Sequence, residues 1–395
     1  MENSWRPKFV FASCQYGAEV VVKSEMARRQ PELRLAFSRP GFITFKLPEE
    51  STEWQTALPR SPFTRASGFS LGKVQGAQAT EMAAAVWQLP EVVAFLETNS
   101  PVDLHVWQRD AATPGKRGFE PGTTALATEV REQLGKASTC EAITQRTAEP
   151  VGPAPRNQWV LDVVLVEPGE WWIGCHRTEH RTACWPGGVP DLQSPEDPVS
   201  RAYMKLSEAL QWSALPIARD DRCVEIGSSP GGASQRLLEA GLEVLGVDPA
   251  AMDDSVLAHP SFTHIRKRAG DVRRKTFSDS HWLFADVNAT PTYTLDAVED
   301  IVTHSSSTIR GMILTLKLTN WDLAEELPAL TERVKSWGYQ DVRLRQLAFN
   351  GKEICLVALR NRSQRRLQRR GRATSKRHRV DAPHSSVPGP HGQES

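Results

Sequence analysis

Residues 201–360 alternate short apolar runs with amphipathic segments, and this alternation constrains the fold more than any other feature. The apolar runs have the length of buried strands, and the segments between them have the spacing of helices. Strands that alternate with helices pair in parallel, with the helices covering both faces of the sheet. The sequence therefore predicts an α/β, Rossmann-like, doubly wound sheet. The expected strands are 222–227, 242–248, 280–287 and 309–318, the expected helices are 200–212, 233–241, 294–305 and 322–338, and 340–349 with 352–360 should form a closing hairpin.

The first half of the chain has a different, mixed α+β pattern. Residues 8–47 predict strands around one helix, and 159–178 predict two strands joined at the Glu167–Glu170 turn. Residues 79–98 and 123–137 predict helices, with a strand at 102–110 between them. The expected division is an N-terminal α+β domain at 1–75, a second α+β domain at 76–184, a Pro/Gly/Ser-rich linker at 185–200, the α/β domain at 201–360 and a basic tail at 361–395.

The charge is distributed unevenly along the chain. The formal net charge is only +1, yet ten Lys or Arg and no acid lie between Arg360 and Arg379, so the remainder, with 38 basic and 47 acidic residues, has a net charge of −9. A basic tail on an acidic body indicates a polyanionic partner, although a solvated tail that aids solubility fits the same composition. Six scattered cysteines, no signal-like start and no run of 18 apolar residues favour a soluble cytoplasmic protein without a membrane partner.

A glycine-rich turn follows the first strand of the α/β region, in the stretch "CVEIGSSPGGAS" at 223–234. Glycines allow the backbone to turn sharply and to approach a ligand at the carboxyl end of the strand. The order G-S-S-P-G-G differs from a dinucleotide G-x-G-x-x-G, and Pro230 has no N–H to offer a phosphate. The turn also lacks the lysine of a P-loop. It is better suited to a carboxylate and an ammonium group than to phosphates.

Two acidic residues follow at the ends of later segments. Asp248, in "LGVDPAAM", stands where a carboxylate accepts both hydroxyls of an adenosine ribose. Asp271, in "RAGDV", is placed in a loop where it can accept from the exocyclic amine of adenine. A glycine turn, a ribose acid and an adenine acid in this order indicate S-adenosylmethionine as the cofactor. The expected cofactor-binding residues are Glu225, Gly227, Ser228, Pro230, Gly231, Gly232, Ala233, Asp248, Asp271 and Asp286.

Four isolated charged residues complete the candidate site: Lys205, Asp286, Lys317 and Glu353. Each alone is compatible with an exposed strand end or helix face. Lys317 is hardest to explain in that way, because its strand is otherwise apolar and a lysine there must be paired or point into a crevice. Together the four suit methylation of a sugar hydroxyl, which requires an aligned oxygen and removal of one proton. Burial and Lys205 should lower the pKa of Lys317, whereas Asp286 and Glu353 should raise it, so the sequence leaves its resting charge open.

These motifs resemble the FtsJ-like family of RNA 2′-O-ribose methyltransferases. The resemblance covers about residues 199–360 and is carried by "SRAYMKL", "VEIGSSPGGAS", "FADV", "LTLKL" and "KEICLVALR". It implies that Lys205, Asp286, Lys317 and Glu353 form the family's catalytic Lys-Asp-Lys-Glu tetrad, with Lys317 as general base and RNA as substrate. "RPGFITFKL" and "VLDVVLVEPGEWWIGCHR" resemble the ferredoxin-like and THUMP RNA-binding parts of the enzymes of this family that methylate 23S rRNA. Ala233 stands where the family commonly has an aromatic residue, and the basic tail is not part of its pattern.

Other interpretations compete with this one. An RNA-binding protein with a catalytically inactive methyltransferase fold fits the same motifs, and Ala233 leaves room for it. Cys175, His176, His180 and Cys184 have a plausible spacing for zinc but no C-x-x-C pair, so no metal is expected there. Trp171 and Trp172 are placed to stack on bases, yet packing in the core or hairpin explains them better. Base N-methylation is disfavoured because "DVNATP" stands where its (N/D)-P-P-aromatic motif would be.

Overall fold

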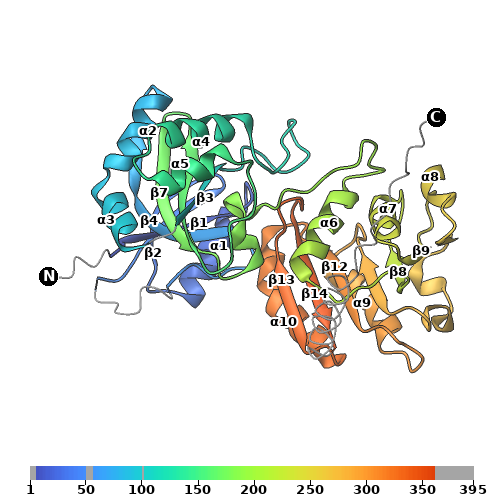
Figure 1. Ribbon diagram of the computed structural model, residues 1–395. Coiled ribbons are helices and arrows are strands. Elements are labelled where there is room, and N and C mark those ends of the chain that lie inside the picture. Colours follow the sequence, from blue (N-terminus) through green and yellow to red (C-terminus); the bar gives the residue numbers. More distant parts are fainter. Residues whose placement is uncertain (1–5, 50–56, 100–101, 361–395) are drawn as a thin grey trace, which may run out of the picture.

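The computed structural model describes residues 6–49, 57–99 and 102–360. In this part of the chain each half of the sequence forms a seven-stranded sheet with helices packed against it (Figure 1). The predicted basic tail at 361–395 lies outside the described residues. No helix in the described ranges has the length and apolar character needed to cross a membrane.

The first sheet is almost entirely antiparallel. In spatial order its strands are β2 (Arg34–Arg39), β3 (Phe42–Lys46), β1 (Phe9–Ser13), β4 (Ala66–Gln75), β7 (Glu170–Arg177), β6 (Trp159–Glu167) and β5 (Val102–Gln108). Among these described strands, β5 and β6 are the one parallel pair. Strand β4 pairs with β1 on one side and with β7 on the other. The sheet therefore continues across residue 75, where the sequence predicts a domain boundary. That boundary stays a prediction, and the two units that it would separate share one sheet.

Helices of the first half pack against this sheet and against one another. They are α1 (Glu19–Arg29), α2 (Ala79–Gln88), α3 (Pro90–Thr98), α4 (Ala125–Ala137) and α5 (Glu141–Ala148). The Thr124 side chain caps α4 by accepting a hydrogen bond from the Ala127 N–H at 3.1 Å. Val86, Phe95 and Leu134 are fully buried and connect α2, α3 and α4 to the core. The predicted helices at 79–98 and 123–137 are thus present, and α5 is an additional helix.

The second sheet is the predicted doubly wound sheet. In spatial order its strands are β10 (Phe262–Ile265), β9 (Glu243–Val247), β8 (Arg222–Ile226), β11 (Trp282–Ala285), β12 (Gly311–Lys317), β14 (Glu353–Leu359) and β13 (Asp341–Arg345). The chain builds from β8 toward β9 and β10, then returns to add β11 on the other side of β8. This reversal leaves a crevice at the carboxyl ends of β8 and β11, which is where α/β sheets bind ligands.

The central strands of this sheet are buried, whereas the edge strands β10 and β13 are only partly buried. Every residue of β11 and β14 is buried, and all of β8 except Arg222. The helices of this half are α6 (Ala202–Ser213), α7 (Gly232–Glu239), α8 (Asp254–Leu257), α9 (Pro291–Val302) and α10 (Leu327–Ser336). Continuous apolar strands are typical of a parallel sheet covered on both faces.

The closing hairpin is confirmed, with one topological detail that the sequence does not reveal. β13 and β14 pair antiparallel, and β14 lies between β13 and β12, also antiparallel to β12. The predicted helix at 322–338 begins as a 3-10 turn at Trp321–Glu326 and becomes α10 only at Leu327. Pro328 lies in the first turn of α10, a position that proline tolerates, and it has no N–H to continue a preceding helical ladder.

Candidate active site

Four charged side chains converge at one edge of the second sheet. Lys205 comes from α6, Asp286 follows β11, Lys317 ends β12 and Glu353 begins β14. Because β12 and β14 are antiparallel, Lys317 and Glu353 are directly opposite each other in the pairing register. Such opposed residues project from the same face of a sheet. The fold thus brings together all four residues that the sequence singles out, here called the charged cluster.

The four groups alternate in charge. The Lys317 Nζ lies 2.7 Å from Asp286 Oδ1 and 2.7 Å from Glu353 Oε1. The Lys205 Nζ lies 2.8 Å from Glu353 Oε2 and 3.6 Å from Asp286 Oδ2. The side chains keep between 11% and 19% of their exposure, so the charged cluster is partly buried but reachable from solvent. Two cations and two anions leave it without net charge.

The resting charge of Lys317, which the sequence leaves open, follows from this geometry. Burial lowers the pKa of the Lys317 ammonium, but the charges and hydrogen bonds of Asp286 and Glu353 outweigh burial and raise the pKa above its ordinary value. Lys317 is therefore a protonated ammonium group near neutral pH. A base role requires a change in its surroundings that lowers this pKa.

The glycine turn packs directly behind Asp286. Gly227 has a φ of +78°, which favours glycine, and a Cβ there would lie 2.8 Å from the Asp286 backbone oxygen. Gly231 has a φ of +127°, and its missing side chain gives room to Val256. Gly232, the first residue of α7, is different: a Cβ there would lie 2.2 Å from the Ser200 Oγ. Gly232 thus makes room for the end of the predicted linker rather than for a ligand.

Other predicted cofactor residues surround a small cavity beside the charged cluster. Its volume is about 30 Å³, and it is lined by Glu225 and Ala233 together with Lys205 and Asp286. Glu225 is buried and accepts a hydrogen bond from the Ser234 hydroxyl. Burial is the main cause that raises the pKa of Glu225, to about 8, so much of this carboxyl is neutral at pH 7. Ser228 is also buried, and its hydroxyl contacts the Met252 sulfur at 3.4 Å.

The two predicted adenosine acids lie in separate loops. Asp248 follows β9, and its carboxylate accepts the Ser229 N–H at 3.2 Å and the Ala250 N–H at 2.8 Å. It therefore holds the glycine turn in place from the neighbouring strand. Asp271 ends a 3-10 turn after β10 and is exposed, and its N–H donates to the Arg268 carbonyl. Pro230 is exposed in the glycine turn.

Sequence reasoning missed a polar chain that reaches the charged cluster from the first half of the protein. The Asn350 side-chain amide donates to Glu353 Oε2 at 3.3 Å, and the Asn350 carbonyl accepts from the Gln15 side-chain amide. Gln346 donates to Gln15 Oε1 at 3.0 Å. Gln15, Gln346 and Asn350 are each at most 3% exposed. No local signal reveals the contact, because Gln15 and Asn350 are 335 positions apart.

The remaining candidates from the sequence do not form a site together. Neighbouring residues of a strand point to opposite faces, so Cys175 and His176 of β7 diverge. His180 accepts the Ala183 N–H on its Nδ1 and caps a 3-10 turn. Trp171 is 1% exposed in the core, and Trp172 packs on Phe37 and Phe42 with ring centroids 5.1 and 5.5 Å apart. The preference for packing over base stacking is thus confirmed for Trp171, whereas for the half-buried Trp172 it stays a prediction.

Comparison with known families gives this site a context. The FtsJ-like methyltransferase family matches residues 198–343. Over these residues, which are less than half of the chain, the protein is similar to that family. The match includes Lys205, Asp286 and Lys317 of the charged cluster and ends before Glu353, which the register of β14 brings to the FtsJ-like domain.

Several curated relatives share one name, ribosomal RNA large subunit methyltransferase M. The protein of Azoarcus sp. (strain BH72) is 26% identical over 205 residues, which is 49% of this chain and 55% of that protein. The protein of Alkalilimnicola ehrlichii is 32% identical over 145 residues, 35% of this chain and 38% of its own length. The chain thus spans about half the length, or less, of these relatives. The fibrillarin pre-rRNA processing protein of Methanococcus jannaschii, at 13% identity over 50% of this chain and 81% of its own, has a TM-score of only 0.33, which supports no conclusion.

Proposed function

We propose that this protein transfers a methyl group from S-adenosylmethionine to a ribose 2′-hydroxyl of large-subunit (23S) rRNA. The observation that carries the proposal is the charged cluster, in which Lys317 is held by Asp286 and Glu353 at the carboxyl edge of an FtsJ-like domain. The names of the relatives support rRNA as the substrate class. The sequence favours a cytoplasmic location, and a protein located there would have access to rRNA.

The crevice suits a cofactor of this kind. Gly227 and Gly231 let the turn after β8 pack closely against Asp286 and Val256, Asp248 presents a half-buried carboxylate at the next strand, and Asp286 lines the cavity. A cavity of about 30 Å³ holds a small group and not a nucleoside, so the nucleoside would lie along the open crevice. When bound, S-adenosylmethionine supplies an activated methyl on a cationic sulfonium. Glu225, largely neutral, would add little charge of its own near that cation.

The charged cluster would orient the hydroxyl and take its proton. Lys317 is protonated at rest, so its amine must first lose a proton. A second cation nearby and the exclusion of water both lower the pKa of an ammonium group, and a bound sulfonium with a bound nucleotide would provide both. The neutral amine then accepts the hydroxyl proton as the ribose oxygen bonds to the methyl carbon and the carbon–sulfur bond breaks. Lys205 also pairs with Glu353. This pairing weakens the attraction of Glu353 for the Lys317 ammonium group, so that Lys317 can lose its proton.

The first half of the protein and the tail are proposed to bind RNA. The resemblance of 1–75 and 76–184 to ferredoxin-like and THUMP parts supports this for the first sheet, and the ten basic residues between Arg360 and Arg379 support it for the tail. Deleting 361–395 should weaken RNA binding and flatten its dependence on salt, because fewer counterions are released. Unchanged affinity at every salt concentration would remove the tail from the proposal.

The test of the proposed function is methyl transfer by the purified full chain. Ribosomal RNA from cells that lack the gene would be incubated with radiolabelled S-adenosylmethionine, and the product mapped for ribose methylation. We expect one or a few large-subunit ribose positions to be labelled. Calorimetry with S-adenosylmethionine separates the alternatives: binding without transfer to any rRNA, or no binding at all, would favour an RNA-binding protein with an inactive fold.

A further inference from the structure

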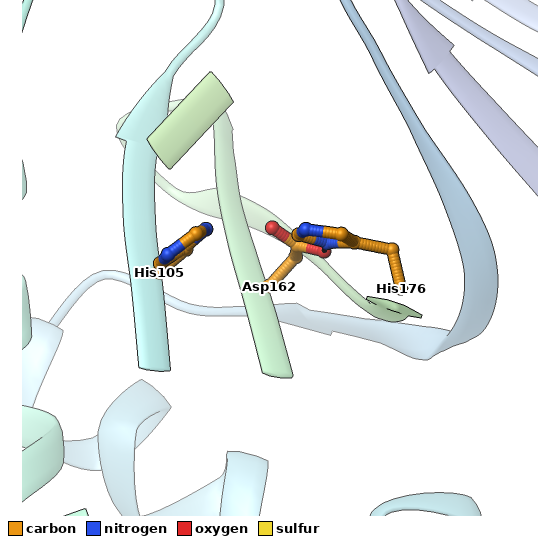
Figure 2. A group of neighbouring side chains, drawn as sticks. All are labelled: His105, Asp162 and His176. Atoms are coloured by element: carbon orange, nitrogen blue, oxygen red, sulfur yellow. Dashed lines mark hydrogen bonds and ion pairs between the residues drawn. The ribbon is translucent and has the colours of Figure 1, made fainter. Parts of the chain in front are cut away.

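Three buried side chains on neighbouring strands of the first sheet form a polar cluster outside the FtsJ-like domain. They are His105 on β5, Asp162 on β6 and His176 on β7, with exposures of 2%, 1% and 6%. One nitrogen or oxygen atom from each lies within 4.8 Å of the others. Figure 2 shows the Asp162 carboxylate lying between the two imidazole rings.

The pairing register explains why the three meet. His105 is directly opposite Asp162 in the parallel pair of β5 and β6. His176 is opposite Val160, which is two residues before Asp162 and therefore on the same face of β6. The arrangement thus follows from the backbone of three strands and not from a mobile loop.

His176 and Asp162 are paired with each other in the structure, and the outer contacts of both point away from the shared space. The His176 Nδ1 lies 2.5 Å from Asp162 Oδ2, and its Nε2 lies 2.8 Å from the Ala183 carbonyl oxygen. The Trp107 indole N–H donates to Asp162 Oδ1 at 3.2 Å, which leaves Oδ2 on the side of the histidines. Histidines that bind metals commonly donate their other ring N–H to a backbone carbonyl, as His176 is placed to do.

His105 is the independent observation that points to a missing ligand. Within the described residues neither of its ring nitrogens has a hydrogen-bond partner, although the side chain is buried. A buried polar group without a partner destabilises a fold, because it has lost its hydrogen bonds to water. A cation between His105, Asp162 and His176 would give one of these two ring nitrogens a partner.

We propose that His105, Asp162 and His176 bind one divalent transition-metal ion, with Zn²⁺ as the occupant. Two imidazoles and one carboxylate suit zinc better than magnesium or calcium, and three protein ligands leave a fourth position for water. Ligands of one tetrahedral zinc lie roughly 3.3 Å apart, so the His176 ring and Asp162 must separate by less than about 1 Å on binding. The ion would tie the edge strand β5 to β6 and β7.

The first test is the metal content of the full chain. The protein, without a polyhistidine tag, would be produced in medium supplemented with zinc, passed through a chelating column, and analysed by mass spectrometry. We expect about one zinc per chain in the wild type and in His259→Ala, which removes a histidine from the other half of the protein. His105→Leu should contain less than a tenth of that amount. A chain shortened by residues 361–395 should keep its zinc, which would exclude the histidines at 378, 384 and 391.

The second test uses stability and a spectroscopic probe. If zinc is bound, His105→Leu loses it and its melting temperature falls below that of the wild type. If the site is empty, leucine replaces an unpartnered imidazole and the melting temperature stays the same or rises. If the variant fails to fold, the wild-type protein produced with Co²⁺ provides the test. Visible absorption typical of a tetrahedral cobalt site would support the proposal. Wild-type protein without zinc and without this absorption would overturn it.

Discussion

Lys317 and Glu353 are directly opposed in the antiparallel pairing of β12 and β14, and their charged groups lie 2.7 Å apart. Asp286 holds the same ammonium group at the same distance from the other side. A lysine in this position is both oriented and kept protonated by its neighbours. The proposed reaction needs the first effect and must overcome the second.

Removing the amine should separate binding from transfer. We expect Lys317→Ala to bind S-adenosylmethionine as the wild type does, measured by calorimetry, and to lose methyl transfer by a factor of about 10² to 10⁴. Lys335→Ala is the matched control, because Lys335 is also a lysine paired with a glutamate, but on the exposed face of α10. Normal turnover in Lys317→Ala would remove this residue from the mechanism.

The pH dependence of the rate should report the pKa of Lys317. The Lys317 amine must lose its proton before it can act, so kcat should rise as pH increases through the pKa that Lys317 has in the complex with cofactor and RNA. Glu353 is one cause of the raised pKa, so Glu353→Gln should move the rising limb to lower pH. The measurement is kcat against pH for both proteins. If Glu353→Gln leaves the rising limb at the same pH, that limb reports the ionisation of a group other than Lys317.

A substitution in the glycine turn should affect transfer through Asp286. In Gly227→Ala the new Cβ meets the Asp286 backbone oxygen at 2.8 Å and must displace it. We expect kcat to fall roughly ten- to a hundredfold, since small displacements of reacting groups reduce rates strongly. Gly338→Ala provides the control: its φ of +93° gives similar backbone strain, but nothing lies within 4 Å of its Cβ. Equal effects in both variants would mean that strain, and not Asp286, is responsible.

The contact between the two halves of the protein should support the charged cluster. Gln15→Ala leaves the buried Asn350 carbonyl without its donor, and we expect a loss of about 1 to 3 kcal/mol in the free energy of unfolding. Because Asn350 donates to Glu353, kcat should also fall while the affinity for S-adenosylmethionine is kept. The exposed Gln145→Ala on α5 is the control. An unchanged kcat would show that Asn350 holds Glu353 without help from Gln15.

Glu225 should make the fold less stable as pH rises. Its pKa in the folded protein is about 8, against an ordinary value of 4.5, so the folded state keeps a proton that the unfolded state releases. The contribution of Glu225 to the free energy of unfolding is therefore lost between about pH 4.5 and pH 8, and it does not change further above pH 8. Glu225→Gln keeps an acceptor for Ser234 and should abolish this loss. Denaturant unfolding at pH 5 and pH 8 measures it, and an equal pH effect in both proteins would contradict it.

The second sheet and its charged residues were predictable because their signals are local. The apolar runs identify β11 and β12, and Lys317 is conspicuous as one charge at the end of such a run. β4 was missed because it contains two glycines and few apolar residues. The structure explains Gly68: a Cβ there would lie 2.7 Å from the Phe11 ring, so packing between strands requires its absence. Gln15 and Asn350 could not be paired from the sequence, since only the complete fold brings them together.

The antiparallel course of β14 also makes the length of the loop before it part of the site. Side chains alternate between the two faces of a strand, so a slip of β14 by one position would bring Lys352 or Ile354 opposite Lys317 in place of the carboxylate. A slip that places Lys352 there would bring two positive charges together. A slip that places Ile354 there would set the Lys317 ammonium group against a hydrocarbon side chain. An insertion or deletion within residues 346–352 should therefore damage the charged cluster as much as the loss of the acid that follows them.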